Sequence, residues 1–485
     1  MSMRDLNLEL PEDGRPFYLR LAEAVRGAIR GGRARPGEPL PSTRALATTA
    51  GVHRHTVMAA LDELVAEGWL VARPGAAYRV TPRLPDEYFE ASRTVKSKAP
   101  PAVVQLVPVR TVKVPVPGPV DLPFAFRSGL PDLTLFPFDE LRGHVSDALK
   151  REPLALAGFS DPAGAAPFLR ELSTYLRRVR AVVPDKLVVT HGSQEGLFLA
   201  GQLLAQAGDA IAVERVGYPP AWEALRASGA ALHPLGIDAE GVDPDALERL
   251  AQRRRVKLVY LTPLHQYPTT ATLPAPRRVA LYEICARHGI AILEDDYDHE
   301  FHYRSQPLAP LAASDPAGIV LYASTFSKVL FPSARLGYLG VPASVGEPLR
   351  ALKRIVSRQN DGLLQAGVAR WMAEGGFERH LRRMRREYGR RLEALVAALT
   401  QARERVPELA WRTPDGGMAL WLATPWDSRA AARAAAAAGV FVHPGADFQL
   451  EPAADRHLRL GFATMAPERI AEGVTRLVDA CARLR

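Results

Sequence analysis

A chain of 485 residues, 47% of them hydrophobic, is long enough for at least two folding units with buried cores, and a net charge of +9 is compatible with a polyanionic partner. No uncharged apolar run reaches the roughly 18 residues of a membrane span, and the first ten residues lack the apolar stretch of a secretory signal, so we expect a cytoplasmic protein. Two cysteines, Cys285 and Cys481, lie too far apart in sequence to suggest a metal site or a disulfide framework.

Residues 1–85 predict a small domain of three helices and a hairpin. Apolar residues recur at helical spacing over 19–29, and two further helices are expected over 42–51 and 54–67. A short hairpin with a Pro-Gly turn is expected within 70–81. Helix, helix, turn, helix and hairpin is the order of elements in a winged helix-turn-helix.

The rest of the chain predicts a linker and a larger α/β domain. Residues 86–122 are rich in proline, valine and lysine and have little helical periodicity, so they predict an extended linker, with a buried edge strand as the alternative. In residues 123–485, apolar strands alternate with amphipathic helices; the expected strands are KLVVT, AIAVE, VKLVYLT, GIAILED, GIVLYAS and RLGYLGV. This alternation predicts a parallel sheet covered on both faces, which binds ligands at the carboxyl ends of its strands.

The third predicted helix begins His53-Arg54-His55-Thr56, where a recognition helix would enter the major groove of DNA. Arg54 can donate to guanine or to phosphate, and Thr56 can bond a phosphate or touch a thymine methyl group. Arg44, at the start of the preceding helix, is placed to bind the DNA backbone. The alternative is a small helical dimerisation or docking domain whose arginines are solvated.

Three segments of the larger domain each fit one part of a pyridoxal-phosphate site. Lys328 follows the strand GIVLYAS among hydroxyl groups, with Arg335 seven residues later, which suits a Schiff base beside a bound phosphate. Acidic residues 294–298 follow GIAIL, where an acid can pair with the pyridinium nitrogen, although a metal site or a solvated turn has the same pattern. Residues 191–196 form a turn whose backbone amides can hold a phosphate. Each signal is weak alone, and their order makes the set specific.

The segment LPSTRALATTAGVHRHTVMAALDELVAEGWLVARPG resembles the GntR-type winged helix. This resemblance implies DNA contacts at four positions that match the family, Ser42, Arg44, Arg54 and Thr56. His55, within the same recognition helix, is also predicted to contact DNA. Two positions depart from the family pattern. His53 stands where a serine usually caps the recognition helix, and Gly75-Ala76-Ala77 stands where the wing tip is usually Gly-x-Gly. We therefore expect operator affinity or sequence preference to differ from the family norm.

Over most of its length the chain is similar to the MocR subfamily of GntR regulators, in which the winged helix precedes a fold-type I aminotransferase-like domain. The similarity rests on FSDPAGAAPFLRELSTYLRRVR, VYLTPLHQYPTT, ILEDDYDHEFHYRSQPL and YASTFSKVLFPSARLGY. It implies that pyridoxal 5'-phosphate is held on Lys328 as an internal aldimine. The other implied roles are the pyridine nitrogen partner for Asp295, the ring-hydroxyl partner for Tyr297, ring stacking for Tyr218, phosphate binding for Ser193, Gln194, Thr325 and Arg335, and effector-carboxylate binding for Arg459.

Two of these residues could instead have purely structural roles, and the family pattern is broken nearby. Arg459 could form a surface ion pair at a strand end, and Tyr218 could be a core residue. Thr270 and Ala181 stand where the family has glycine, so we expect the loop at Thr270 to lack glycine's backbone freedom. These departures concern the effector pocket and do not touch Lys328.

We expect a homodimeric one-component transcription regulator that binds double-stranded promoter DNA and senses a small amine or amino acid, which displaces Lys328 from the cofactor. Two alternatives stay open at this point. One is a working aminotransferase with a vestigial N-terminal segment. The other is a repressor whose large domain is a dimerisation scaffold without a cofactor. Multiple turnovers without operator binding would favour the first, and the absence of a cofactor absorbance band would favour the second.

Overall fold

The structure, a computed structural model, describes residues 8, 10–73, 76–86, 122–303 and 308–484. The chain divides into two compact units, residues 1–108 and residues 109–485. The predicted linker lies almost entirely outside the described residues. Among the helices of the described ranges, none is both long and apolar enough to cross a membrane.

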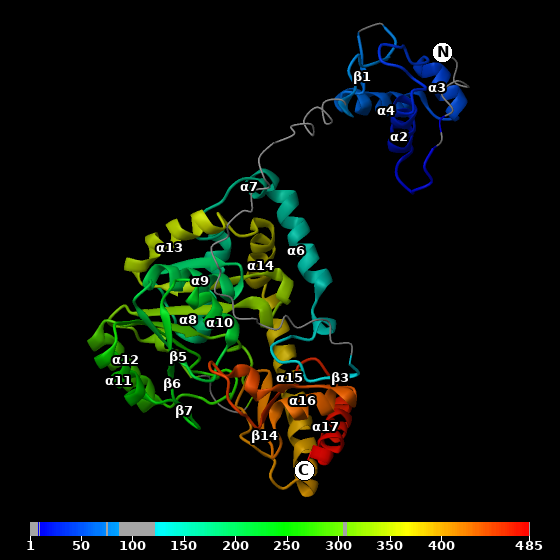
Figure 1. The fold of residues 1–485 in the computed structure, drawn as a ribbon. Helices are drawn as coiled ribbons and strands as arrows, with labels where there is room; N and C mark the ends of the chain where they lie inside the picture. Colours follow the sequence, from blue (N-terminus) through cyan, green and yellow to red (C-terminus); the bar gives the residue numbers. More distant parts are fainter. Residues whose placement is uncertain (1–7, 9, 74–75, 87–121, 304–307, 485) are drawn as a thin grey trace, which may run out of the picture. The chain divides into compact units, whose positions relative to one another are not determined.

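In its described residues, the smaller unit has the three helices α2, α3 and α4 and a two-stranded hairpin around one apolar core (Figure 1). Its elements are α2 (Phe17–Arg30), α3 (Thr43–Ala50), α4 (Arg54–Ala66), β1 (Leu70–Val71) and β2 (Arg79–Val80). The apolar faces of the three helices pack together, and β1 pairs with β2 in antiparallel fashion to form the wing. The predicted winged helix-turn-helix is confirmed.

The larger unit is built on a seven-stranded sheet with the order β4-β12-β11-β10-β9-β5-β6. Its strands are β4 (Lys186–Thr190), β5 (Ala210–Glu214), β6 (Ala231–Leu235), β9 (Val256–Leu261), β10 (Ala291–Asp295), β11 (Val320–Thr325) and β12 (Gly337–Val341). All six predicted strands are present, and β6 is an additional edge strand that the sequence analysis missed.

One strand runs against the others. β12 pairs antiparallel with both β11 and β4, so the prediction of a wholly parallel sheet was wrong. A parallel return requires a crossover long enough to pass over the sheet, usually a helix. Residues 326–336, between β11 and β12, contain only two short 3-10 turns, η3 (Phe326–Lys328) and η4 (Pro332–Ala334). The chain therefore reverses direction at the carboxyl end of β11.

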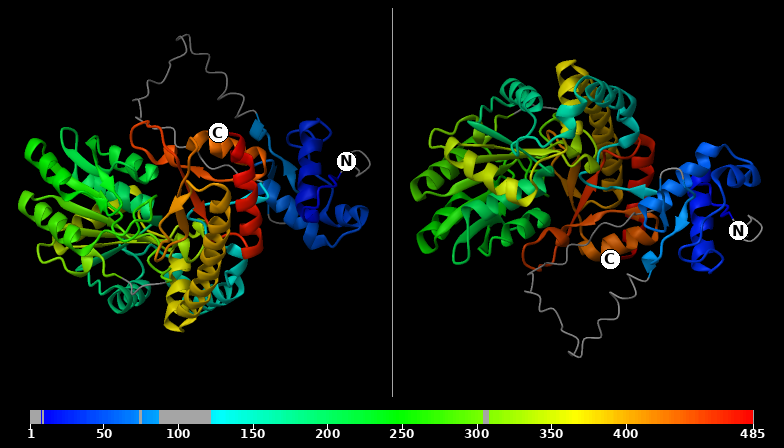
Figure 2. Two further views of the ribbon diagram at one scale, coloured as in Figure 1. Left: turned by 90° about the horizontal axis from the view of Figure 1, so that it is seen from below. Right: turned by 90° about the horizontal axis from the view of Figure 1, so that it is seen from above.

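Helices cover both faces of this sheet (Figures 1 and 2). One face packs on α9 (Gly192–Leu204), α10 (Pro219–Arg226) and α13 (Ala343–Val356). The other face packs on α8 (Ala166–Arg180), α11 (Pro244–Arg253) and α12 (Ala275–His288). The strands are buried on both sides, which explains their nearly continuous apolar sequences.

The C-terminal part forms a second, antiparallel sheet with the order β13-β14-β17-β16. The remaining elements are β3 (Phe124–Ala125), α6 (Phe138–Arg151), α7 (Pro153–Ala157), α14 (Gly362–Ala373), α15 (Gly376–Arg405), β13 (Ala410–Trp411), β14 (Ala419–Ala423), α16 (Ser428–Ala437), β15 (Val440–Phe441), β16 (His443–Pro444), β17 (His457–Gly461) and α17 (Pro467–Cys481), with the two-residue pair β7 (Ile237–Asp238) and β8 (Gly241–Val242). β3 pairs with β15, so the first described residues of the larger unit pack on its C-terminal part.

Candidate DNA interface and cofactor site

Two helix starts gather the residues that the sequence predicts to bind DNA. At α3, the Ser42 Oγ accepts a hydrogen bond from the Ala45 amide at 3.2 Å, which is the expected cap. At α4, the side chain of His53 makes no capping hydrogen bond, and its ring stacks on that of His55 with centroids 6.0 Å apart. The first amides of α4 therefore have no side-chain acceptor from the cap residue, which leaves them for water or a phosphate.

Arg54 is oriented by a contact that the sequence analysis missed. Its Nε donates to the Thr43 Oγ1 at 3.0 Å, which ties the start of α4 to the start of α3. Arg44, Arg54 and His55 are exposed, and Thr56 is half-buried. The structure thus brings the five predicted residues to neighbouring helix ends, and their contact with DNA stays a prediction.

In the larger unit, the turn between β4 and α9 packs against Arg335. Gly192 has a φ of +73°, and a Cβ atom there would lie 3.1 Å from both terminal guanidinium nitrogens of Arg335. The Nη2 of Arg335 donates to the His191 carbonyl at 2.6 Å. Ser193 follows in the first turn of α9. A guanidinium, a hydroxyl and the amides of a helix start are the groups that a phosphate requires.

Two other predicted phosphate ligands have partners within the protein. The Nε2 of Gln194 donates to the Pro220 carbonyl at 2.8 Å. The Oγ1 of Thr325 accepts from the Ser327 amide at 3.1 Å and lies 2.9 Å from the Ser327 Oγ. Ser327 therefore brings a second hydroxyl to the end of β11, and the phosphate role of Gln194 and Thr325 stays a prediction.

A buried ion pair holds the turn before α9 in place. The Glu195 Oε2 accepts from the His191 amide at 2.7 Å and from the Lys353 Nζ at 3.0 Å. Lys353 comes from α13 and is fully buried. Its burial lowers the pKa of Lys353, and the charge of Glu195 opposes that shift. Because Lys353 lies far away in sequence, no local pattern could have shown this pairing.

Asp295 and Asp296 are adjacent but have different surroundings. The Tyr260 hydroxyl donates to Asp295 Oδ2 at 2.8 Å, whereas Asp295 Oδ1 is buried and has no hydrogen-bond partner in the described part of the chain. Asp296 accepts from the Arg180 Nη2 at 2.7 Å and from the Tyr322 hydroxyl. Asp296 is therefore neutralised within the protein, and Asp295 retains an oxygen that can receive another donor.

Burial favours the neutral forms of both Asp295 and Lys328 and shifts their pKa values accordingly. It raises the pKa of Asp295 to about 7, against the lowering effects of the Tyr260 hydrogen bond and the Lys328 charge. It lowers the pKa of Lys328, against the raising effects of Asp298 and Asp295. The Lys328 amine donates to the Gly129 carbonyl at 2.7 Å. A buried amine with a lowered pKa is less protonated and therefore a better nucleophile toward an aldehyde.

Arg459 lies in β17 and is 2% exposed, so the alternative of a surface ion pair is wrong. Its guanidinium carbon lies 4.2 Å from the centroid of the Tyr267 ring, and its Nη1 donates to the Pro268 carbonyl. Its Nε is buried and lacks a hydrogen-bond partner within the described residues. A buried guanidinium with unused donor capacity beside an aromatic ring fits an incoming carboxylate.

Two predicted ring-binding tyrosines lie beside Tyr267. The Tyr218 ring meets the Tyr267 ring edge-on, with centroids 5.1 Å apart. The Tyr297 ring lies 5.8 Å from that of Tyr267, and the Tyr297 hydroxyl donates to the His265 carbonyl at 3.0 Å. Burial raises the pKa of Tyr218, and Tyr267 and Asp295 add to this shift through their charges.

The loop that carries Pro268 corrects one expectation. Thr270 has a φ of +63°, so the loop takes the left-handed conformation of a glycine although it lacks the glycine. Ala181, at the end of α8, does the same with a φ of +55°. The surrounding hydrogen bonds impose this conformation, because the Thr270 amide donates to the Gln266 carbonyl at 2.7 Å. The departures from the family pattern therefore preserve the backbone and add local strain.

Comparisons with known proteins match this geometry. Residues 136–477 match the aminotransferase class I and II family, and residues 17–80 match the bacterial regulatory proteins of the gntR family. The chain is 34% identical to the HTH-type transcriptional regulator TauR of Rhodobacter capsulatus, over 95% of this chain and 96% of TauR. It is 31% identical to the probable rhizopine catabolism regulatory protein MocR of Rhizobium meliloti, over 96% of this chain and 94% of that protein. The chain belongs to the MocR-type regulators of the GntR family.

The larger unit of this MocR-type regulator has a fold-type I aminotransferase fold. It resembles the α-aminoadipate aminotransferase LysN of Thermus thermophilus at 30% identity with a TM-score of 0.68, over 74% of this chain and 92% of LysN. Together with the GntR domain, this fold makes the chain a transcription regulator with an aminotransferase-like domain.

Such aminotransferase domains depend on pyridoxal phosphate, and the residues of this MocR-type regulator fit that cofactor. Asp295 Oδ1 is an unpartnered acceptor of the kind that a protonated pyridine nitrogen needs. Gly192 allows the turn before α9 to approach Arg335, where a phosphate would lie, and Lys328 supplies an amine from a half-buried side chain. Within the described ranges, no group of three or more His, Cys, Asp or Glu is arranged to hold a metal, so the acidic segment gives no support to a metal site.

Proposed function

We propose that this MocR-type regulator holds pyridoxal 5'-phosphate on Lys328 and uses it to sense a small amine or amino acid. The observation that carries the proposal is the buried, unpartnered Oδ1 of Asp295, whose charge interacts with that of Lys328. A buried carboxylate oxygen without a donor is costly, and a protonated pyridine nitrogen would supply that donor. When bound, the cofactor supplies an aldehyde that combines reversibly with amines and a ring that withdraws electrons.

Each of the proposed site residues binds a different part of this cofactor. Lys328 binds it covalently through an amine whose pKa is lowered by burial. Asp295 orients the ring through its nitrogen. Arg335 and Ser193, with the first amides of α9, hold the phosphate. The remaining assignments are Gln194 and Thr325 beside the phosphate, Tyr218 against the ring face and Tyr297 at the ring hydroxyl.

The effector of this proposal carries a carboxylate as well as an amine. Arg459 is buried and makes no ion pair among the described residues, so an incoming carboxylate would find a desolvated cation. Trp421 and His443 pair with Arg459 across the neighbouring strands and therefore share its face of the sheet. Tyr267 contacts the guanidinium directly, with its ring centroid 4.2 Å from the guanidinium carbon.

The smaller unit binds promoter DNA in this proposal. Ser42, Arg44, Arg54, His55 and Thr56 are the proposed contacts, with exposed arginines at the two helix starts. Such arginines bind phosphates and guanine edges. Because promoter DNA is the partner, we place the regulator in the bacterial cytoplasm.

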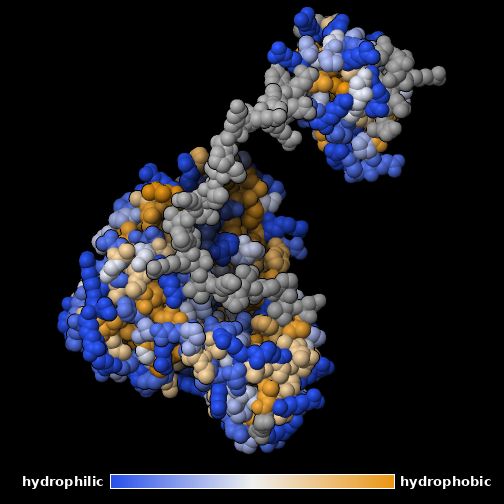
Figure 3. All heavy atoms as spheres, in the orientation of Figure 1, coloured by the Kyte–Doolittle hydropathy of each residue, from blue (hydrophilic) through white to orange (hydrophobic). Residues whose placement is uncertain are grey.

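A second copy of the chain is the proposed partner of an exposed apolar patch on the larger unit. Leu154, Phe159 and Ile355 are 88%, 80% and 79% exposed, which is unusual for large apolar side chains. The guanidinium of Arg358 lies 4.0 Å from the Phe159 ring centroid and brings the two segments together. Figure 3 shows apolar surface where α7 and the C-terminal end of α13 lie. Conversion of Phe159 and Ile355 to aspartate should shift the sedimenting species from dimer to monomer.

Borohydride reduction of the protein loaded with pyridoxal phosphate, followed by peptide mass spectrometry, tests the cofactor proposal. The reduced adduct should lie on Lys328, and Lys328→Ala should lose it together with the visible absorbance of the bound cofactor. Lys257→Ala, which removes a lysine from β9, should keep both. An adduct on another residue, or no adduct, would overturn the proposal. A steady-state assay with amino donors and keto acids shows separately whether any aminotransferase turnover accompanies promoter binding.

A further inference from the structure

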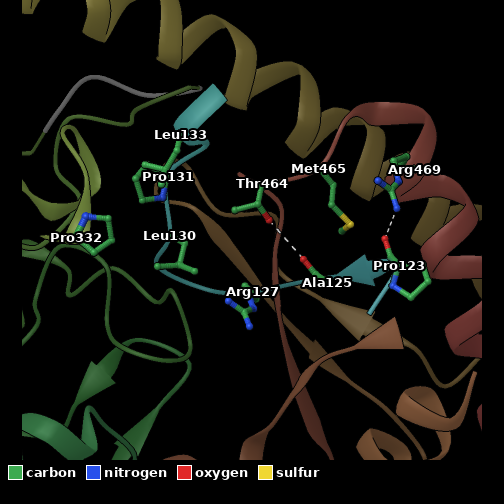
Figure 4. A pocket seen from close by; sticks show the side chains of 10 residues that line it. All are labelled: Pro123, Ala125, Arg127, Leu130, Pro131, Leu133, Pro332, Thr464, Met465 and Arg469. Atoms are coloured by element: carbon green, nitrogen blue, oxygen red, sulfur yellow. Dashed lines mark hydrogen bonds between the residues drawn. The ribbon is translucent and has the colours of Figure 1, made fainter. Parts of the chain in front are cut away.

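The segment that leads into the larger unit passes the cofactor lysine. We call residues 122–135, which contain β3 and the 3-10 turn η1 (Leu133–Leu135), the entry arm. Figure 4 shows residues of this arm lining a cavity of about 340 Å³, together with Pro332, Thr464 and residues near the start of α17. In sequence the entry arm directly follows residues 87–121, and the DNA-binding unit precedes those.

The backbone of the entry arm contacts the Lys328 amine. The Nζ of Lys328 donates to the Gly129 carbonyl at 2.7 Å. Gly129 has a φ of +75°, and a Cβ atom at this position would lie 3.0 Å from the Nζ. A side chain at position 129 would therefore be strained by this backbone conformation and would crowd the amine, and glycine avoids both. Beside it, the Ser128 Oγ is buried and lacks a hydrogen-bond partner in the described part of the chain.

The entry arm is anchored on both sides of this contact. At its start, β3 pairs with β15, and the Phe126 amide donates to the Phe441 carbonyl at 2.9 Å. At its end, the Asp132 carboxylate pairs with Arg391 of α15 at 2.8 Å, and the Asp132 amide donates to the Tyr388 hydroxyl at 2.8 Å. The part between these anchors borders the cavity on one side and packs on Gly461 of β17, where a Cβ atom would lie 1.9 Å from the Arg127 carbonyl oxygen.

We infer that the entry arm senses the state of Lys328 through Gly129 and transmits it along the chain to the DNA-binding unit. An amine that combines with an aldehyde loses two hydrogens in the water released, so Lys328 keeps at most one hydrogen to donate. An effector that displaces Lys328 restores the full donor set. Gly129 therefore faces different hydrogen-bonding partners in the two states. The inference rests on the proposed function for the cause of the change, whereas the contact itself can be tested without cofactor.

Hydrogen–deuterium exchange on the cofactor-free full chain tests the contact. In Lys328→Met, which keeps an unbranched side chain one atom shorter and removes its donors, the amides of the entry arm should exchange about tenfold faster, as expected when one hydrogen bond from an amine is lost. Gly129→Ala should have the same effect with Lys328 intact. Lys150→Met removes an exposed lysine of α6 and should leave the arm unchanged.

The affinity of the same proteins for the promoter fragment upstream of the gene tests the transmission. Lys328→Met and Gly129→Ala should both change the Kd for this fragment by at least about threefold, and Lys150→Met should not. Peptides from β9 serve as an internal reference for global destabilisation. The inference is wrong if amide exchange in the entry arm increases no more than exchange in β9 in both variants. It is also wrong if exchange in the arm increases and the Kd for the promoter fragment stays the same. Failure to retain pyridoxal phosphate would overturn the proposed function and leave this cofactor-free result standing.

Discussion

The Tyr260 hydroxyl donates to one carboxylate oxygen of Asp295 at 2.8 Å and leaves the other oxygen buried without a hydrogen bond within the described residues. Tyr260 lies on β9 and pairs with Leu293 of β10, so Asp295 follows two positions later on the same face. The two parallel strands thus present a tyrosine and an acid at the same edge of the sheet. A second donor, such as a pyridinium nitrogen, would complete the hydrogen bonding of this acid.

The pKa of Asp295 predicts how the stability of the cofactor-free protein depends on pH. Burial raises this pKa from its ordinary value of 3.8 to about 7, so the folded state prefers the protonated acid. The stability that protonated Asp295 contributes is fully present below the ordinary pKa and is lost as pH rises through the pKa of the folded state. Asp295→Asn should therefore gain stability relative to the wild type between pH 4 and pH 8, by up to about 4 kcal/mol at 1.4 kcal/mol per pKa unit. Urea unfolding across this range measures the difference.

Asp296→Asn is the matched control for this experiment. Asp296 is paired with Arg180, and its loss would leave a buried guanidinium without its partner. The control should therefore be destabilised at neutral pH, by about 3 kcal/mol or more. If Asp295→Asn and the wild type show the same pH dependence, the raised pKa is wrong.

Thr270→Gly should stabilise the protein. A side chain in the left-handed region costs about 1–2 kcal/mol, and glycine returns about 0.4–1 kcal/mol of this through its freer unfolded state. With a φ of +63° at Thr270, the net gain should be about 0.5–1 kcal/mol in the free energy of unfolding. Thr269→Gly is the control, because the Thr269 Oγ1 donates to the Gln266 Oε1 at 2.6 Å and its removal should destabilise by about 1 kcal/mol. A loss of stability in Thr270→Gly would contradict the assignment of strain.

Sequence patterns located the ends of the strands but did not show the contacts between residues at those ends. Asp295, Lys328 and the turn at Gly192 were found because each follows an apolar strand, and the carboxyl ends of such strands share one edge. The contact between Gly129 and Lys328 joins residues 199 positions apart, and no local periodicity reports it. Tyr260 looks like any other apolar strand residue until its neighbour on β10 is known.

The direction of β12 shows a second limit of sequence patterns. A strand buried on both faces has the same apolar composition whichever way it runs. Only the short connection over residues 326–336 distinguishes the two directions. Its length indicates an antiparallel strand once β12 is known to lie beside β11. The left-handed backbone at Thr270 could not be predicted either. Threonine disfavours this conformation, and the surrounding structure imposes it.

Thr43 should contribute to DNA affinity without touching DNA. Its Oγ1 accepts from the Arg54 Nε and so fixes the guanidinium at the start of α4. Arg54→Ala should weaken promoter binding by about 1–3 kcal/mol, and Thr43→Val by a smaller amount, about 1 kcal/mol. Thr48→Val is the control on the same helix, because Thr48 bonds only within α3 to the Arg44 carbonyl. Fluorescence anisotropy with a promoter fragment measures all three. Equal affinities for Thr43→Val and Thr48→Val would show that the contact does not orient Arg54.

Arg459→Met should separate recognition of a carboxylate from reaction of an amine. Methionine keeps an apolar contact with the Tyr267 ring and removes the guanidinium that lies 4.2 Å from it. The protein loaded with pyridoxal phosphate can be mixed with aminooxyacetate, which carries a carboxylate, or with methoxyamine, which does not. Loss of a charge-assisted pair worth about 1.5–3 kcal/mol should slow the spectral change with aminooxyacetate about 10- to 100-fold and leave the methoxyamine rate unchanged. Equal slowing with both reagents would mean that Arg459 supports the fold of the site and does not receive the effector's carboxylate, because only aminooxyacetate tests the charge.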